Sequence, residues 1–144
     1  MKCQPTWGPA ALGGIEGNSG NPGYPSAVLA VLNLSWATEQ PSIIEPGNAP
    51  LLSVHGTADA TLPYFQGRIG SLLPPKYVYG SGRLNPRATA GGVRNTLMHQ
   101  SRAGHIPFES NATYAGTSFR TIRNFLRPGL GQAGTVLAAW ASGG

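Results

Sequence analysis

Three short apolar runs mark out the chain, and each has the length of a β-strand. Residues 28–34 (VLAVLNL) form a continuous apolar run, which is typical of a strand buried on both faces of a parallel sheet. Residues 50–54 (PLLSV) form a second run that stops at the loop 55–59. Residues 95–100 (NTLMHQ) are short and mixed, and they lead into the loop 103–105. The pattern therefore predicts three strands, of which the last two end in short loops.

Helical patterns lie between and after these runs. Residues 63–73 are expected to form a short helix that stops at the two following prolines, and residues 83–94 a second helix, weakened by two glycines near its end. After residue 110, positions on one helical face recur at intervals of three and four residues, which predicts an amphipathic helix ending near Pro128. These positions are Tyr114, Ser118, Phe119, Ile122, Phe125 and Leu126.

The order of these elements is the alternation of strands and helices found in parallel α/β sheets. We therefore expect an α/β fold with a mostly parallel sheet of about three strands and flanking helices. Glycine and proline crowd residues 1–26, which predicts a loop-rich start to a single domain at 1–128. Residues 129–144 are rich in glycine and alanine and weakly patterned, so they are interpreted as a disordered or foreign tail.

The charge of the chain raises the question of nucleic-acid binding. The 144 residues suit one domain, and ten basic residues against five acidic ones give a net charge of +5. However, no run of lysine and arginine occurs, and no zinc-finger, RNA-recognition or P-loop spacing is present. Arg83, Arg87 and Arg94 can share one helical face, but a solvated face explains them better. We therefore expect no nucleic-acid partner.

The sequence shows no pattern for a metal, a cofactor or a membrane span. Cys3 is the only cysteine, so no disulfide within the chain and no cysteine-rich metal site is expected. The spacing of His55, His99 and His105 matches no recognised metal pattern. No apolar stretch approaches the roughly 18 residues of a membrane span, and no signal-peptide apolar region follows Met1.

Two residues that suit acid–base chemistry follow predicted strands. Asp59 and His105 each come just after a strand, and the carboxyl ends of parallel strands are where α/β proteins place catalytic groups. A histidine that acts as general base needs a carboxylate on its other ring nitrogen, and Asp59 is the only aspartate in the chain. Two plainer interpretations remain open. Asp59 can cap a helix beginning near Pro63, and His105 can be an ordinary surface histidine.

The other two histidines have simpler expected roles. His55 directly follows the second apolar run and precedes Gly56, so we expect it to pack or to form hydrogen bonds at the strand end. His99 lies inside the third predicted strand, which indicates a structural role.

A resemblance to a known family starts from residues 49–64 (APLLSVHGTADATLPY). This stretch closely resembles the acid segment of α/β-hydrolase esterases and lipases. In that family the strand ends in a His-Gly turn, the catalytic aspartate follows three residues after the glycine, and a Val/Leu-Pro pair comes soon afterwards. The resemblance implies that Asp59 is the catalytic acid.

Residues 103–108 (AGHIPF) resemble the catalytic-histidine segment of the same family, which implies that His105 is the general base. Residues 17–24 and 28–35 resemble the family's region between the nucleophile helix and the acid strand. The resemblance covers roughly residues 13–126. It implies the C-terminal half of an α/β-hydrolase fold, and secretion is compatible with the family, although the sequence leaves the location unknown.

The nucleophile of such an enzyme is missing from its expected place. A serine esterase carries its serine on a strained Gly-x-Ser-x-Gly elbow, and none of the eleven serines fits. Ser19 is the nearest match, but the fifth residue of its motif is Asn21 and Pro22 stands where the nucleophile helix should run. Residues 80–82 (GSG) place the second glycine one position too close. By family order, the nucleophile would lie upstream of residue 13.

The sequence therefore supports two functions. The first is a carboxylic-ester hydrolase, or its acid and base half, in which Asp59 orients His105 and Ser19 is the one nucleophile candidate to test. Tyr64, Phe65 and Phe108 suit a hydrophobic acyl group, an aromatic ester or a polyester, although they can equally belong to the core. The second is a catalytically incomplete fragment that serves binding or assembly. A half-sheet leaves an open edge, so a homo-oligomer is expected in either case.

Overall fold

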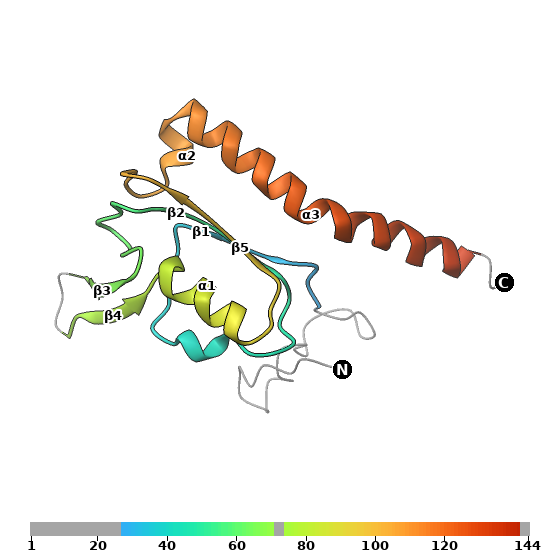
Figure 1. Ribbon diagram of the computed structural model, residues 1–144, viewed down its shortest axis with the longest axis horizontal. Coiled ribbons are helices and arrows are strands. Elements are labelled where there is room, and N and C mark those ends of the chain that lie inside the picture. The colour runs from blue at the N-terminus through green and yellow to red at the C-terminus, as the bar shows by residue number, and fades with distance from the viewer. Residues whose placement is uncertain (1–26, 71–73, 142–144) are drawn as a thin grey trace.

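The structure is a computed structural model that describes residues 27–70 and 74–141, with side chains as far as residue 130. These residues form a mixed α/β structure with a three-stranded parallel sheet, flanking helices and a small antiparallel strand pair (Figure 1). The predicted α/β class and the parallel sheet of about three strands are confirmed. The loop-rich start predicted for residues 1–26 lies outside the described residues.

The parallel sheet has the order β1-β2-β5, with β2 in the centre. Its strands are β1 (Val31–Leu34), β2 (Leu51–Gly56) and β5 (Asn95–Gln100). Val31 is level with Leu51, and Leu51 is level with Asn95. Two strands that are far apart in sequence therefore flank one central strand, and their carboxyl ends lie at the same edge of the sheet.

The core is built around β2, in which all six residues are buried. Leu52 and Val54 are fully buried because β2 is paired on both sides and covered on both faces. Leu51 packs in a cluster with Ala88 and Val93. A continuous apolar run is the pattern that such a doubly covered strand requires.

Helices cover both faces of the sheet. Helix α1 (Ser81–Ala90) lies on one face, and α3 (Ala112–Ala141) crosses the other (Figure 1). Two short helical turns, η2 (Pro41–Ile43) and α2 (Pro107–Ser110), connect the main elements. Within the described residues, no helix combines the length and the apolar character needed to cross a membrane.

The short helix predicted over residues 63–73 is wrong. This segment contains the strand β3 (Gln66–Ile69), which pairs antiparallel with β4 (Lys76–Tyr79) in a second sheet; residues 71–73 lie outside the described part. Gly70 has a φ of +87°, which an α-helix does not accommodate. The backbone of β3 instead pairs antiparallel with β4, and the local sequence pattern did not predict this pairing.

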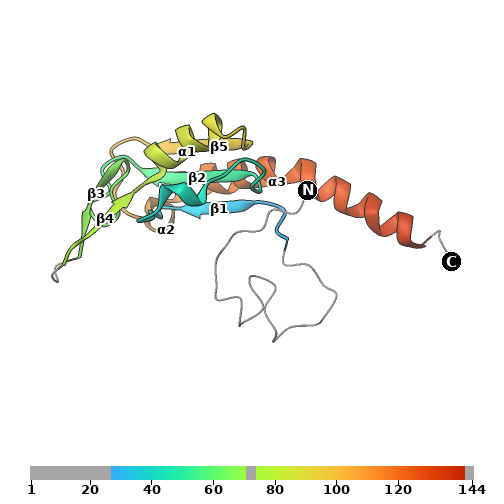
Figure 2. The same ribbon diagram turned by 90° about the horizontal axis from the view of Figure 1, so that it is seen from below.

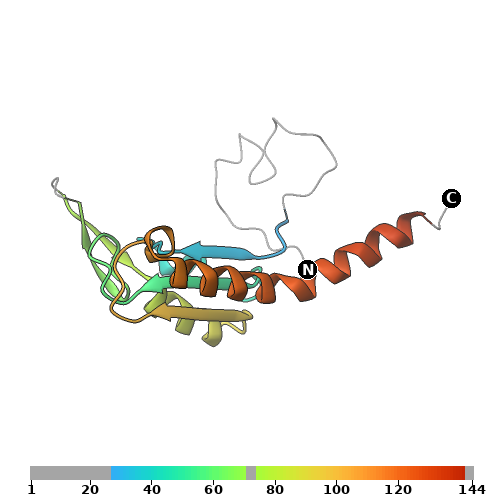
Figure 3. The same cartoon turned by 90° about the horizontal axis from the view of Figure 1, so that it is seen from above.

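The remaining helices begin or end at other residues than expected. Helix α1 spans 81–90 rather than 83–94, because the chain leaves the helix at Gly91 and Gly92 has a φ of +69°. Helix α3 does not end near Pro128 but continues to Ala141. A proline removes a single N–H donor, and the other hydrogen bonds of a helix can persist around it. The C-terminal half of α3 extends beyond the sheet (Figure 3).

The first strand is shorter and more exposed than its sequence predicts. It begins at Val31 rather than at residue 28, and Val31, Leu32 and Leu34 are all exposed. Strand β1 is an edge strand because only β2 pairs with it, and Figure 2 shows it at the outer side of the sheet. The expectation of burial on both faces is therefore wrong for this strand, and only Asn33 is buried within it.

Candidate functional site

The carboxyl ends of β2 and β5 continue into two loops that are joined by backbone hydrogen bonds. The N–H of Thr57 donates to the carbonyl of Gln100 at 3.0 Å, and the N–H of Ala58 donates to the carbonyl of Ala103 at 2.9 Å. Gly56 makes this contact possible, because a Cβ at that position would overlap the backbone oxygens of residues 103 and 104. The two loops that carry Asp59 and His105 are thus held against each other.

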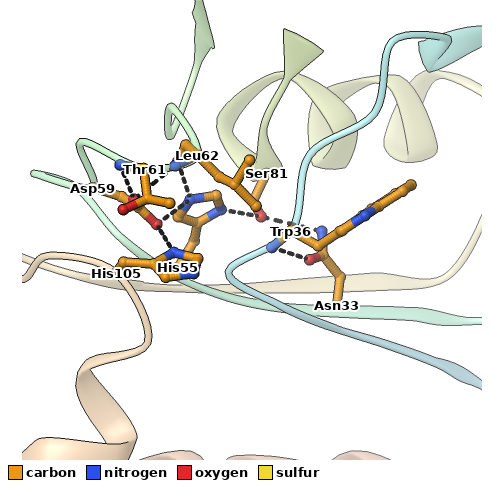
Figure 4. Close-up of polar contacts among 8 residues, drawn as sticks. All are labelled: Asn33, Trp36, His55, Asp59, Thr61, Leu62, Ser81 and His105. Atoms are coloured by element: carbon orange, nitrogen blue, oxygen red, sulfur yellow. Dashed lines mark hydrogen bonds and ion pairs between the residues drawn. The ribbon is translucent and has the colours of Figure 1, made fainter. Parts of the chain in front are cut away.

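Asp59 and His105 form a direct hydrogen bond across the 46 positions that separate them. His105 Nδ1 lies 2.8 Å from Asp59 Oδ2 (Figure 4). The carboxylate is fully buried, whereas 31% of the His105 side chain is exposed. Because a carboxylate accepts hydrogen bonds, Nδ1 carries the proton and Nε2 presents a lone pair. Nε2 has no hydrogen-bond partner among the described residues, so it is available as a proton acceptor.

The second oxygen of Asp59 stabilises the turn that follows. Asp59 Oδ1 accepts the N–H of Thr61 at 2.8 Å and that of Leu62 at 2.9 Å. This is the local capping that the plainer interpretation anticipated, although no helix follows. Burial by itself raises the pKa of Asp59, but the hydrogen bonds from His105, Leu62 and Thr61 outweigh it and hold the pKa below its ordinary value of 3.8. Asp59 is therefore a stable anion at neutral pH.

His55 is fully buried at the end of β2, and its ring approaches the same Asp59 oxygen as that of His105 (Figure 4). Its Nε2 lies 3.0 Å from the carbonyl oxygen of Leu62 and 3.3 Å from Asp59 Oδ2. Its Nδ1 lies 2.8 Å from Ser81 Oγ. The prediction that His55 forms hydrogen bonds at the strand end is confirmed. His99 lies in β5 as predicted, but its side chain is exposed.

Ser81 and Asn33 extend this network towards β1, and sequence reasoning missed both. Ser81 is the first residue of α1 and is fully buried, and its Oγ accepts a hydrogen bond from Asn33 Nδ2 at 3.2 Å. A Cβ at Gly80 would overlap the carbonyl of Pro63, so the flanking glycine lets the chain pass close enough. The GSG triplet itself was the available signal: small residues on both sides of a serine indicate close packing rather than a displaced elbow.

Of the two aromatic residues predicted to contact substrate, Tyr64 packs against this cluster. The Tyr64 ring stands edge-on to His55 at a centroid distance of 5.6 Å, and burial raises the pKa of Tyr64. Phe108 is half-buried in α2, three positions after His105. Ile106, which directly follows His105, has a φ of +41°. This value is rare for a β-branched residue and turns the chain sharply after His105. Whether Tyr64 and Phe108 bind substrate stays a prediction.

A nucleophile does not lie beside His105 in the described part of the chain. Ser19 lies outside the described residues. Of the described serines, Ser81 binds His55 and Ser118 binds Gln100, and none forms a hydrogen bond with His105. No group of three histidine, cysteine or acidic side chains suited to hold a metal ion occurs among these residues either.

Comparisons of the chain with protein-family models, with curated proteins and with solved structures found no match. The function is therefore inferred from the residues and from their geometry.

Proposed function

We propose that this chain supplies the acid and the base of a serine-type carboxylic-ester hydrolase, in the form of the C-terminal half of an α/β-hydrolase fold. The observation that carries the proposal is the hydrogen bond between His105 Nδ1 and the buried Asp59 carboxylate. It leaves Nε2 of a partly exposed imidazole as the proton acceptor. The parallel order β1-β2-β5, with both residues at the carboxyl edge, supports the fold relationship.

In the proposed reaction, a serine hydroxyl attacks the ester carbonyl while His105 Nε2 takes its proton. The imidazolium then gives this proton to the departing alkoxide, so that an acyl-serine and an alcohol are formed. A water molecule attacks the acyl-serine with the same assistance, which releases the acid and restores the serine. Asp59 remains ionised throughout, which is consistent with its lowered pKa, and stabilises the imidazolium.

The proposed reaction requires a serine nucleophile. Ser19 is the candidate in this sequence, and it can come from the same copy of the chain or from a second copy. The substrate class that we propose is a hydrophobic or aromatic ester, including polyesters, because the Tyr64 ring packs against His55 and Phe108 follows His105 by three positions.

A fluorophosphonate probe tests this proposal because it reacts only with an activated serine. We expect the purified chain to be labelled, and the labelled peptide to identify the nucleophile. Asp59→Asn should slow labelling and hydrolysis of a short p-nitrophenyl ester by about 10⁴-fold, and His105→Ala by a similar factor. Glu39→Gln is a matched control, because it changes an exposed carboxylate paired with Lys76. Absence of labelling, or labelling that neither site variant slows, would reject the hydrolase.

A second candidate function is assembly, favoured by the exposed edge strand. Val31, Leu32 and Leu34 of β1 are exposed, and the outer edge of β1 is unpaired among the described residues. We propose that β1 pairs with β1 of a second copy, which would join two sheets into one. Light scattering after size-exclusion chromatography should show a dimer that Leu32→Lys dissociates and Phe119→Lys, on α3, does not. Monomers at all concentrations would contradict this.

A further inference from the structure

We propose that His55 is a positioning residue for Asp59, and that Ser81 and Asn33 fix the tautomer in which it does so. The geometric part of this proposal stands on the hydrogen bonds alone. Its consequence for catalysis rests on the proposed function. From the sequence, His55 was expected to pack or to form hydrogen bonds at a strand end, whereas Figure 4 shows two imidazoles directed at the same oxygen of Asp59.

The direction of each hydrogen bond follows from the chemistry of the groups. The N–H of Trp36 donates to Asn33 Oδ1 at 2.9 Å, which fixes the amide so that Nδ2 points to Ser81 Oγ. Ser81 Oγ accepts that bond, and its single proton is then free to be donated to His55 Nδ1, 2.8 Å away. His55 Nδ1 can therefore accept this proton, provided that the other ring nitrogen carries the imidazole proton.

The remaining ring nitrogen must then carry the proton. His55 Nε2 faces the carbonyl oxygen of Leu62 at 3.0 Å and Asp59 Oδ2 at 3.3 Å, and both of these oxygens are acceptors. A proton on Nε2 is donated to Leu62 and also faces Asp59, whereas a lone pair there would face two oxygens in a fully buried site. The contacts of Nε2 therefore assign the proton, and Ser81 is able to donate to the Nδ1 lone pair that this tautomer leaves.

The consequence is that N–H groups face both oxygens of the Asp59 carboxylate. Oδ1 accepts the backbone N–H groups of Thr61 and Leu62, and Oδ2 accepts the ring N–H of His105. His55 Nε2 lies 3.3 Å from the same Oδ2, so a proton on Nε2 adds an electrostatic attraction there. The direction in which the carboxylate holds His105 is therefore set by His55 as well as by the turn.

The chain of hydrogen bonds also reaches structure outside the two loops. Asn33 belongs to β1 and Ser81 begins α1, so the orientation of the carboxylate depends on how these elements pack against β2. Ser81→Ala removes the proton donated to His55 Nδ1 and leaves a buried lone pair without a partner. The His55 ring is then held only at its Nε2 end, so its hold on Asp59 should weaken.

Two substitutions at position 55 distinguish the contact made by His55 Nε2 from the contact made by His55 Nδ1. Gln places an amide nitrogen close to the position of Nε2 and keeps a donor for Asp59, whereas Asn reaches only to the position of Nδ1 and keeps the contact with Ser81. We expect His55→Asn to raise the pKa of Asp59 and to slow probe labelling about tenfold, since the N–H that faces the charged Oδ2 is lost. His55→Gln should leave the pKa of Asp59 unchanged and the rate of probe labelling within about twofold of that of the unmodified chain.

The decisive measurement is made on the unmodified chain and needs no variant to fold. Nitrogen-15 NMR of the histidine rings should show His55 with its proton on Nε2 and His105 with its proton on Nδ1, and carbon-13 titration should give the pKa of Asp59. A proton on Nδ1 of His55, or equal pKa values of Asp59 in the Asn and Gln variants, would overturn the positioning role. A chain that shows the expected tautomers but is never labelled would reject the hydrolase and keep the geometry.

Discussion

Gly56 and Gly104 lie so close together that a Cβ on residue 56 would overlap the carbonyl oxygen of Gly104. Gly56 ends β2, and Gly104 directly precedes His105 in the loop after β5. Their approach brings the two loops into contact and lets Ala58 donate its N–H to Ala103. The hydrogen bond between Asp59 and His105 is a consequence of this backbone contact.

The first prediction concerns this contact. Gly56→Ala should force the loops apart, lower the free energy of unfolding by about 1–3 kcal/mol and abolish the Asp59–His105 hydrogen bond. Chemical denaturation measures the first effect, and the ring NMR signals of His105 measure the second. Gly104→Ala is the matched control, because a Cβ there meets nothing within 4 Å. Equal effects of the two substitutions would contradict the proposed role of Gly56.

The second prediction concerns the acid dependence of stability. The pKa of Asp59 in the folded protein is lower than its ordinary value of 3.8, so the unfolded chain binds more protons between the two values. The contribution of Asp59 to stability is therefore fully present above about pH 4 and is lost as the pH falls through the lower, folded value. Denaturation at a series of pH values measures this.

Asp59→Asn supplies the comparison for that series. The variant should be less stable than the unmodified chain at neutral pH, and the difference should shrink as the pH falls below 3.8, because the amide that replaces the carboxylate has no proton to gain. Glu39→Gln should reproduce the pH dependence of the unmodified chain, since its carboxylate is exposed. A stability difference that does not change with pH would mean that the carboxylate charge is not what the site stabilises.

The third prediction tests the placement of the core. Leu52 is fully buried in the central strand, so Leu52→Ala should lower the free energy of unfolding by about 2–5 kcal/mol. Leu130→Ala is the same chemical change at an exposed position of α3 and should change it by less than about 0.5 kcal/mol. Thermal or urea unfolding distinguishes them, and similar losses would show that β2 is not the centre of the sheet.

The fourth prediction tests the continuation of α3 through Pro128. A proline inside a helix costs about 3 kcal/mol relative to alanine, so Pro128→Ala should increase the helical circular-dichroism signal and slow amide exchange in the following turn. Pro46→Ala, in a turn outside the helices, should change neither. If the helix ended at residue 128, the first substitution would have as little effect as the second.

The local sequence pattern was sufficient to predict a helix, which makes its own hydrogen bonds, or a strand that is buried throughout. The apolar run at β2 was found because burial of a central strand leaves a direct mark on composition. The pattern failed at β3, whose partners lie in β4, and at β1, where an apolar run belongs to an exposed edge. An apolar run has the same sequence pattern whether the strand is paired on both sides or lies at the edge of the sheet.

The same division applies to the site. The sequence by itself determined that the single aspartate and one histidine follow separate parallel strands, and the carboxyl ends of such strands share one edge. Only the tertiary structure decided that His105 and His55 both approach Oδ2 of Asp59, and that Ser81 contacts His55 and Asn33 contacts Ser81. Hydrogen bonds depend on distances of about 3 Å between groups that are far apart along the chain, and no local pattern records such distances.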